Sequence, residues 1–211
     1  MFEKFAEISP VVWGILAVLI ISGGMLFLIT RDKKRWTVRM LANASLCIAL
    51  SFILSYVRLY KMPQGGSITL ASMLPLFMFA YAYGVGPGML AGMAYGFLQF
   101  IQDAYFVHPV ELVLDYPLAF AMLGLAGISV KNNGRFGIVP GIVMGAFGRF
   151  LCAFISGIVF FGMYAPEGQH VLIYSAVYNG LYLIPETAIC LVIALIPQIQ
   201  RIARQLAMSE R

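Results

Sequence analysis

The sequence predicts an all-α integral membrane protein, and its composition and length lead to this fold class. Of its 211 residues, 61% are hydrophobic and only 11% are charged, and the mean hydropathy is +0.88. Polar residues are too few to cover the surface of a soluble globule. At about 20 residues for each span, the chain has room for six or seven helices in one bundle and none for a soluble catalytic domain.

Apolar runs and basic clusters together predict the topology. Residues 11–30 form an apolar run followed by RDKKR, a stop-transfer pattern rather than a cleavable signal peptide. Further spans are expected at residues 38–56, 67–83, 87–101, 107–130, 137–163 and 171–197. Basic residues fall in alternate connections, so we expect seven spans with the N-terminus outside and the C-terminus in the cytoplasm. The net charge of +5 then reflects topology rather than nucleic-acid binding.

Small residues recur every four positions in two of these spans. Ser45 and Ala49 form one such pair, and Gly88, Gly92 and Gly96 form a longer stripe. Faces of this kind let another helix approach closely. The connection KMPQGGSIT at residues 61–69 is rich in turn formers and is predicted to be a movable loop.

Two carboxylates lie inside the span at residues 107–130. Glu111 and Asp115 are four residues apart, so they share a helix face, and Pro117 loosens the backbone bonding beside them. An intramembrane acid normally faces a cavity or a partner, because its insertion costs about 2.5–3.5 kcal/mol. Asp115 is therefore either a ligand contact or an internally paired acid. Glu111 is either a second pocket acid or a residue at the membrane surface beside His108.

A second pair of charges is expected to meet within the bundle. Arg149 and Glu186 lie in consecutive spans, each about 16–18 Å from the cytoplasmic end by residue count. A paired acid and base satisfy each other better than either would in lipid, so the sequence predicts an ion pair. If they do not meet, Glu186 becomes a candidate for the pocket.

Enzymatic chemistry is not indicated. The chain has only two histidines, His108 and His170, and contains neither a GxSxG nor an HExxH motif. Its three cysteines are isolated, which predicts neither a metal site nor a redox pair. We therefore expect no catalytic residue, no metal and no cofactor.

Several long blocks resemble the thiamine-specific substrate-binding subunit, or S-component, of the energy-coupling factor (ECF) vitamin transporters, the ThiT/YuaJ family. They are MPQGGSIT at residues 62–69, HPVELVLDYPLAF at 108–120, GRFLCAFISGIVFFGMYAPEG at 148–168 and YSAVYNGLYLIPE at 174–186. The resemblance implies a six-helix membrane domain at residues 37–200. Residues 1–36 then form an extra transmembrane helix with a basic cytoplasmic linker, and residues 201–211 form a cytoplasmic tail.

The same resemblance implies the function and the partners. The chain is expected to capture thiamine and to dock on a transmembrane coupling protein that two ATP-binding-cassette ATPases drive. It has no GxxxxGK[ST] motif, so ATP hydrolysis would fall to those partners. Ser45 and Ala49 match the face that relatives present to the coupling protein.

The ligand-binding positions of the family are carried over by motif. The matching residues are Asp115, Tyr116, Tyr105, Gly157, Phe161, Tyr174 and Asn179, and Glu111 and Gly66 are further candidates. An acid, aromatic faces and an amide suit thiamine, which is a cation that carries an aminopyrimidine ring.

One position departs from the family pattern. Ala153 stands where relatives usually carry histidine, which leaves open an S-component for a thiamine precursor or a related vitamin. A second alternative is an ion-coupled secondary transporter with Asp115 and Glu186 as its relay.

Overall fold

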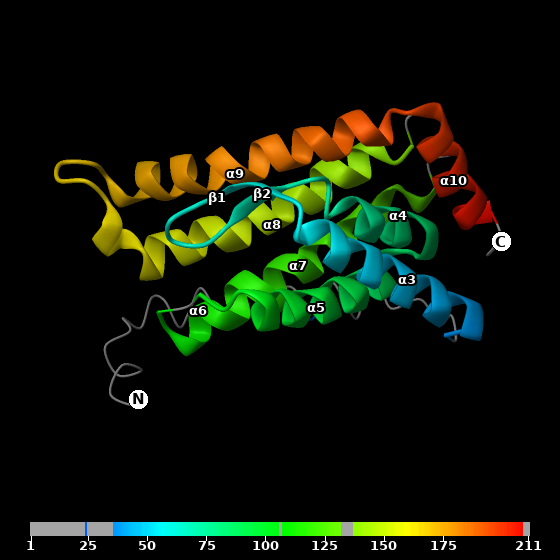
Figure 1. Cartoon of the computed structure of the whole chain (residues 1–211), viewed down its shortest axis with the longest axis horizontal. Helices are drawn as coiled ribbons and strands as arrows, with labels where there is room; N and C mark the ends of the chain where they lie inside the picture. The colour runs from blue at the N-terminus through cyan, green and yellow to red at the C-terminus, as the bar shows by residue number, and fades with distance from the viewer. Residues whose placement is uncertain (1–23, 25–35, 106, 132–136, 209–211) are drawn as a thin grey trace.

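In the part of the chain that the computed structural model describes, four apolar segments are long enough to cross a membrane: α3 (Val38–Ser55), the combined segment Pro109–Ser129, α8 (Val139–Phe160) and α9 (Val171–Ala194). The structure describes residues 36–105, 107–131 and 137–208 together with residue 24. The extra helix expected at residues 11–30 lies outside this part of the chain. Figure 1 shows the described helices side by side in an elongated bundle. The predicted all-α membrane fold is confirmed.

The third predicted span, residues 67–83, is wrong at its start. Residues 67–69 are a β-strand, and the helix α4 (Leu74–Tyr83) covers only ten residues. Ala71 has a positive φ of 58°, and the Thr69 side chain accepts the backbone N–H of Ser72, so this stretch is a tight turn. Nine of the ten α4 residues are buried. The helix therefore fills the core of the bundle instead of facing lipid along its length.

The connection at residues 61–69 forms a hairpin that the sequence did not predict. Strands β1 (Arg58–Lys61) and β2 (Ser67–Thr69) pair antiparallel, and the Met62 N–H donates to the Gly66 carbonyl at 3.0 Å. Figure 1 shows the hairpin running alongside α8 and α9. Main-chain bonding thus gives this loop a defined shape.

Helix α5 (Val85–Gln102) packs backbone to backbone on the segment Pro109–Ser129. A Cβ placed on Gly96 would meet the Tyr116 carbonyl, and one placed on Gly92 would meet that of Phe120. The glycine stripe predicted from the sequence is confirmed as a close-contact face.

The acid-bearing span is not a uniform α-helix. It begins as α6 (Pro109–Val113), widens into the π-helix η1 (Leu114–Leu118), and continues through α7 (Ala119–Ala121) into the 3₁₀ segment η2 (Met122–Lys131). The Ala119 N–H donates to the Leu114 carbonyl, five residues back. Pro117 has no N–H to donate, so the wide turn follows from the loosening that proline predicts.

Helices α8 and α9 are long neighbours joined by a short connection that contains η3 (Gly162–Tyr164). The last predicted span, residues 171–197, ends early: α9 stops at Ala194, and Pro197 begins a separate helix, α10 (Pro197–Met208). Helix α10 has an apolar side that packs on α4 (Figure 1). The residues expected to form the tail, 201–211, thus begin inside a packed helix.

Candidate functional site

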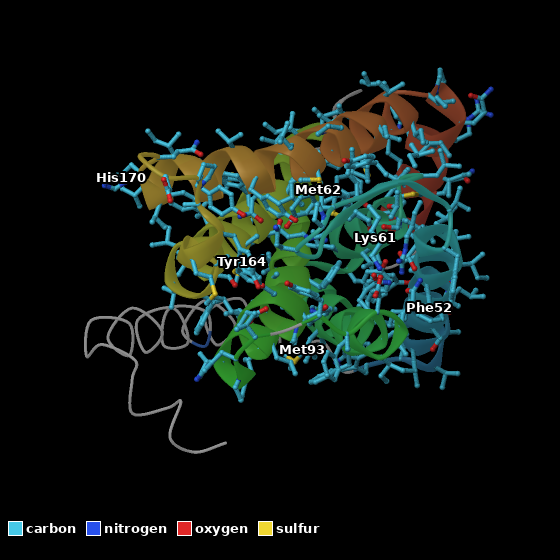
Figure 2. The ribbon with its side chains drawn as sticks, turned by 60° about the vertical axis from the view of Figure 1, so that its left-hand side comes forward. Phe52, Lys61, Met62, Met93, Tyr164 and His170 are labelled. Atoms are coloured by element: carbon cyan, nitrogen blue, oxygen red, sulfur yellow. The ribbon has the colours of Figure 1, made fainter. Side chains whose placement is uncertain are left out.

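A cavity of about 230 Å³ lies beneath the hairpin, enclosed by α8, α9, the π-helix and the loop after α5. Figure 2 shows Lys61 and Met62 of the hairpin against the body of the bundle, with Tyr164 nearer the α8–α9 connection. All nine pocket candidates from the sequence line this cavity: Tyr105, Glu111, Asp115, Tyr116, Gly157, Phe161, Tyr174, Asn179 and Gly66. Residues from four separate stretches of sequence are therefore brought together.

Asp115 lines the cavity, and its two carboxylate oxygens differ in their bonding. Its Oδ2 accepts a hydrogen bond from Ser156 Oγ at 2.7 Å, which joins the π-helix to α8. Its Oδ1 is buried and has no hydrogen-bond partner among the described residues. A buried acceptor without a partner costs free energy, so this oxygen is suited to a donor or a cation from a ligand.

Glu111 lines the same cavity but also holds the local backbone. Its Oε2 accepts the N–H groups of Val107 at 2.6 Å and His108 at 3.0 Å, forming a capping box at the start of α6. The side chain is buried, and its Oε1 has no partner among the described residues. Glu111 thus both lines the cavity and is bonded to His108, so the two positions that the sequence left open do not exclude each other.

Asn179 is held in place by its neighbours. Its amide nitrogen donates to the Ala153 carbonyl at 3.1 Å and to the Ser175 carbonyl at 3.0 Å, and its Oδ1 accepts from Tyr182 at 2.9 Å. Gly157 lies against this group, because a Cβ there would meet Ser175 and the Asn179 amide. The glycine therefore makes room for the amide in the cavity wall.

Aromatic rings form the wall near the α8–α9 connection. Tyr105 and Phe161 stack at an interplanar angle of 20° with ring centroids 6.1 Å apart. A hydrogen bond with Tyr164 and, to a smaller extent, burial raise the pKa of Tyr105 to about 12. Its hydroxyl therefore stays neutral. The wall thus presents uncharged π-faces, which attract a cation.

Tyr116 serves a structural purpose as well as lining the cavity. Its hydroxyl accepts the Tyr105 N–H at 3.0 Å and lies 3.0 Å from the Asp103 carbonyl, to which it can donate. This bonding fixes the loop after α5 against the π-helix. The ring of Tyr116 also packs edge-on against Phe100, with centroids 5.4 Å apart.

Two tyrosines that sequence reasoning missed hold the hairpin over the cavity. The Tyr178 hydroxyl accepts the Gln64 N–H at 2.8 Å and donates to the Gly65 carbonyl at 3.1 Å. Tyr182 lies under Gly66, whose φ of +86° and whose closeness to that ring exclude a larger residue. A signal was present, because Tyr174, Tyr178 and Tyr182 recur every four residues and so share one face of α9.

An ion cluster lies at the base of the hairpin. Asp103 Oδ2 is 2.5 Å from Arg58 Nη1 and 2.7 Å from Lys61 Nζ. The hydrogen bond from Lys61, and then that from Arg58, lowers the pKa of the Asp103 carboxyl. The hairpin is thereby attached to the loop that carries Tyr105.

Arg149 forms part of the cavity wall nearer the core. Its guanidinium carbon lies 4.1 Å from the centre of the Phe120 ring, and its Nη1 lies 2.7 Å from the Met73 sulfur and 3.9 Å from Glu186 Oε2. The predicted pairing of Arg149 with Glu186 is confirmed. Glu186 does not line the cavity and accepts from Thr69 and Ser72, so the alternative in which it binds ligand is not supported.

Ser45 and Ala49 lie apart from the cavity, on an exposed side of α3. The Ser45 hydroxyl donates to the Leu41 carbonyl one turn earlier at 3.0 Å, so the face stays small and smooth. Among the residues that the structure describes, no group of three His, Cys, Asp or Glu side chains could hold a metal ion.

Comparison with known sequences places the chain in a family. The family model described as "Thiamine transporter protein (Thia_YuaJ)" matches residues 41–205. The chain belongs to this family. The match begins within α3 and ends within α10, so it includes every element that forms the cavity and leaves out the first apolar run.

Two relatives support the same placement, and one solved structure has the same fold. "Thiamine transporter ThiT" of Bacillus subtilis (strain 168) is 37% identical over 145 residues, covering 63% of this chain and 75% of that protein. The protein of the same name from Lacticaseibacillus paracasei is 30% identical over 138 residues, covering 57% and 68%. The ThiT structure from Listeria monocytogenes superimposes with a TM-score of 0.70 over 81% of this chain and 97% of that one, at 22% identity. That likeness shows a common fold.

Proposed function

We propose that this member of the thiamine transporter family is the substrate-binding subunit of an ECF-type importer, which captures thiamine from outside the cell and passes it to an ATP-driven coupling module. Family membership supports the ligand class. The observation that carries the assignment is the cavity beneath the hairpin, where a buried acid with a free oxygen faces stacked aromatic rings. This combination suits an organic cation that has both a charged and a hydrogen-bonding ring.

The roles of individual residues follow from the chemistry of thiamine. Asp115 accepts charge-assisted hydrogen bonds from the aminopyrimidine, and Asn179 bonds a ring nitrogen after exchanging one of its internal partners. Phe161, Tyr105 and Tyr174 hold the thiazolium through cation–π contact. A full cation–π contact in a desolvated site is worth about 2 kcal/mol, comparable to one charged hydrogen bond.

The remaining candidates shape the site. Gly157 leaves space beside the Asn179 amide, and Gly66 lets the hairpin turn lie close over the ligand. Tyr116 fixes the loop that carries Tyr105, and Glu111 supplies a second negative charge. These roles follow from the contacts that each residue makes around the cavity.

Orientation is part of the proposal. Arg39 lies near the start of α3, and Arg201 and Arg204 lie on α10, at the end of the bundle away from the hairpin (Figure 1). By the positive-inside rule that end faces the cytoplasm, so the hairpin and the cavity face outside. The cavity then opens toward the compartment from which a vitamin is taken up. In this topology the chain lies in the plasma membrane with its N-terminus outside and its C-terminus in the cytoplasm.

Delivery would depend on partners. We assign the exposed face of Ser45 and Ala49 to contact with a transmembrane coupling protein, which two ABC-type ATPases drive. The small side chains and the internally bonded Ser45 hydroxyl support this role, because they allow a second helix to approach closely.

A second candidate ligand is favoured by one residue. Ala153 lines the cavity with a side chain that has neither an aromatic face nor a polar group. A thiamine ring beside Ala153 would find no stacking or hydrogen-bonding partner there. A thiamine precursor or a related vitamin that has no such ring at this place would lose nothing.

Calorimetric titration of the purified protein tests the proposal. Thiamine and its separate pyrimidine and thiazole halves are titrated under the same conditions. We expect thiamine to bind more tightly than either half, because the acid and the aromatic wall engage different rings. Tighter binding of one half would assign the cavity to a precursor, and the absence of binding by all three would refute a thiamine site.

A further inference from the structure

Two carboxylates, Glu111 and Asp115, line one cavity, and the imidazole of His108 lies at the start of the same helix as Glu111. Glu111 and Asp115 lie one helical turn apart on the same segment, and each has one oxygen without a hydrogen-bond partner among the described residues. The side chain of Glu111 is only 1% exposed. Two like charges at this spacing inside a membrane repel each other. Ionising both carboxylates without a bound cation therefore costs free energy.

The two carboxylates differ in how well their surroundings support a charge. Glu111 accepts two backbone N–H groups, from Val107 and His108, and these favour the ionised form. Asp115 accepts only the hydroxyl of Ser156. The ionised member of the pair is therefore Glu111, and Asp115 is the one that protonates more readily.

The other groups around Asp115 do not neutralise it. Arg149, the cation on α8 that lines the cavity, also lies 3.9 Å from Glu186 Oε2 and over the Phe120 ring, so its one positive charge is shared with Glu186 and offsets the two cavity carboxylates only in part. The thiol of Cys152 on α8 and the phenols of Tyr116 and Tyr182 are neutral at physiological pH.

The charges near the hairpin are engaged with one another. Arg58 and Lys61 both contact Asp103 at the base of the hairpin, and this cluster includes the only cations on the hairpin strands. The α7 residues next to the π-helix are alanine and phenylalanine and bring no charge. The cavity interior thus retains the two negative charges of Glu111 and Asp115 unless one of them takes up a proton.

We propose that Asp115 carries a proton when the cavity is empty, and that binding of the cationic ligand releases this proton. The inference rests on the proposed function, because it requires a positively charged ligand. In the exchange the Oδ1–H bond of Asp115 breaks, the proton passes to water or buffer, and the ligand cation takes its place. The net charge of the cavity is the same before and after binding, so the ligand enters without adding charge to the membrane interior.

Affinity then depends on pH in a defined direction. Because binding releases a proton, the Kd falls as pH rises, by up to tenfold for each unit while Asp115 is protonated in the empty protein. Above the pH at which the empty site loses its proton, the Kd becomes constant. A site with two permanently ionised acids would show no such dependence over the same range.

Titration calorimetry in several buffers measures the released proton directly. The full-length protein is titrated with thiamine at about pH 6 in buffers of different ionisation enthalpy, and the ligand's own protonation is subtracted. We expect the observed enthalpy to vary with the buffer in proportion to about one proton released. In Asp115→Asn the binding enthalpy should no longer vary with the buffer. The Kd of this variant should be weaker and should no longer vary with pH. Glu167→Gln, at an exposed acid in the α8–α9 connection, is the control and should release the same proton as the parent.

Infrared difference spectroscopy provides a readout that does not depend on the affinity of the variant. Addition of thiamine to the parent should remove the band of a protonated carboxyl group, and the empty Asp115→Asn protein should lack that band. Thiamine binding with no proton release, or release that persists in Asp115→Asn, would overturn this inference and leave the proposed function standing. Failure of the parent to bind thiamine at any pH would instead overturn the proposed function.

Discussion

Arg149 Nη1 lies 3.9 Å from Glu186 Oε2, joining α8 to α9 in the interior of the bundle. The side chain of Glu186 is 2% exposed and that of Arg149 is 12% exposed. Glu186 Oε1 also accepts hydroxyl groups from Thr69 and Ser72, at 2.5 Å and 3.0 Å. One carboxylate thus connects both long helices to the turn between β2 and α4.

Breaking this pair should destabilise the protein. Arg149→Ala or Glu186→Ala leaves a buried charge without its partner, which costs about 3–5 kcal/mol. The apolar double replacement Arg149→Met with Glu186→Leu should recover part of that loss. Thermal unfolding in detergent measures the effect without a ligand. If the double variant is no more stable than the worse single variant, the two charges do not depend on each other.

Asp115→Asn should weaken thiamine binding by about 1.5–3 kcal/mol at neutral pH, the range for a hydrogen bond to a charged group. The amide keeps the size of the side chain and can still accept from Ser156, so the unfolding temperature should change little. Calorimetry measures the Kd, and Glu167→Gln on the exposed connection is the matched control. A parental Kd in Asp115→Asn would contradict its place in the site.

Asp103→Asn should slow the entry of a cationic ligand. Without this carboxylate, Arg58 and Lys61 at the base of the hairpin are no longer neutralised, and they repel a cation. Lys61→Gln should have the opposite effect. The association rates of the parent and the two variants should differ less at high salt than at low salt, because screening weakens the repulsion. Equal rates at low salt for the parent and both variants would exclude steering by this cluster.

The same cluster predicts a small dependence of stability on pH. Hydrogen bonds from Lys61 and Arg58 lower the pKa of Asp103, so their stabilisation is present above the unfolded value of about 3.9 and is lost as pH falls through the folded pKa. The side chain is 38% exposed, so solvent screening limits the contribution to about 0.2–1 kcal/mol. Acid titration of unfolding should show this loss in the parent and not in Asp103→Asn.

Tyr178→Phe should loosen the hairpin turn. The change removes the hydroxyl that bonds Gln64 and Gly65 but keeps the ring, at a cost of about 1 kcal/mol. We expect faster hydrogen exchange at the Gln64 amide and faster release of bound thiamine. Tyr60→Phe, at an exposed tyrosine of β1, is the control. Unchanged exchange at Gln64 would show that the hydroxyl does not hold the turn.

Ser45→Leu or Ala49→Leu should leave thiamine binding intact and abolish uptake by cells. A bulky side chain on this face of α3 would hold a coupling helix away, while the cavity lies elsewhere. Ala188→Leu, at an exposed alanine of α9, is the control for a leucine added to the lipid-facing surface. Normal uptake with either α3 variant, at parental protein levels, would contradict the docking role.

The sequence predicted the features that depend on spacing and depth. The pairing of Arg149 with Glu186 follows from equal depth, and the contact face of Gly92 and Gly96 follows from their four-residue interval. The hairpin escaped prediction because its strands are only four and three residues long and surround a turn-rich loop. Tyr178 was overlooked because aromatic residues are common in every span, so only its shared face with Tyr174 could have singled it out.

The wide turn at Leu114–Leu118 also shows why the acid-bearing span is sensitive to length. One extra residue within the turn rotates all that follows by about 100° relative to a regular α-helix. This offset lets Asp115 point to the cavity while Gly124, further along, meets the backbone of α5 at Gly88. Removing a single residue from the turn would restore a regular helix. Asp115 could then no longer face the cavity while Gly124 packs against α5. Insertions and deletions here are therefore far less tolerable than substitutions of similar size.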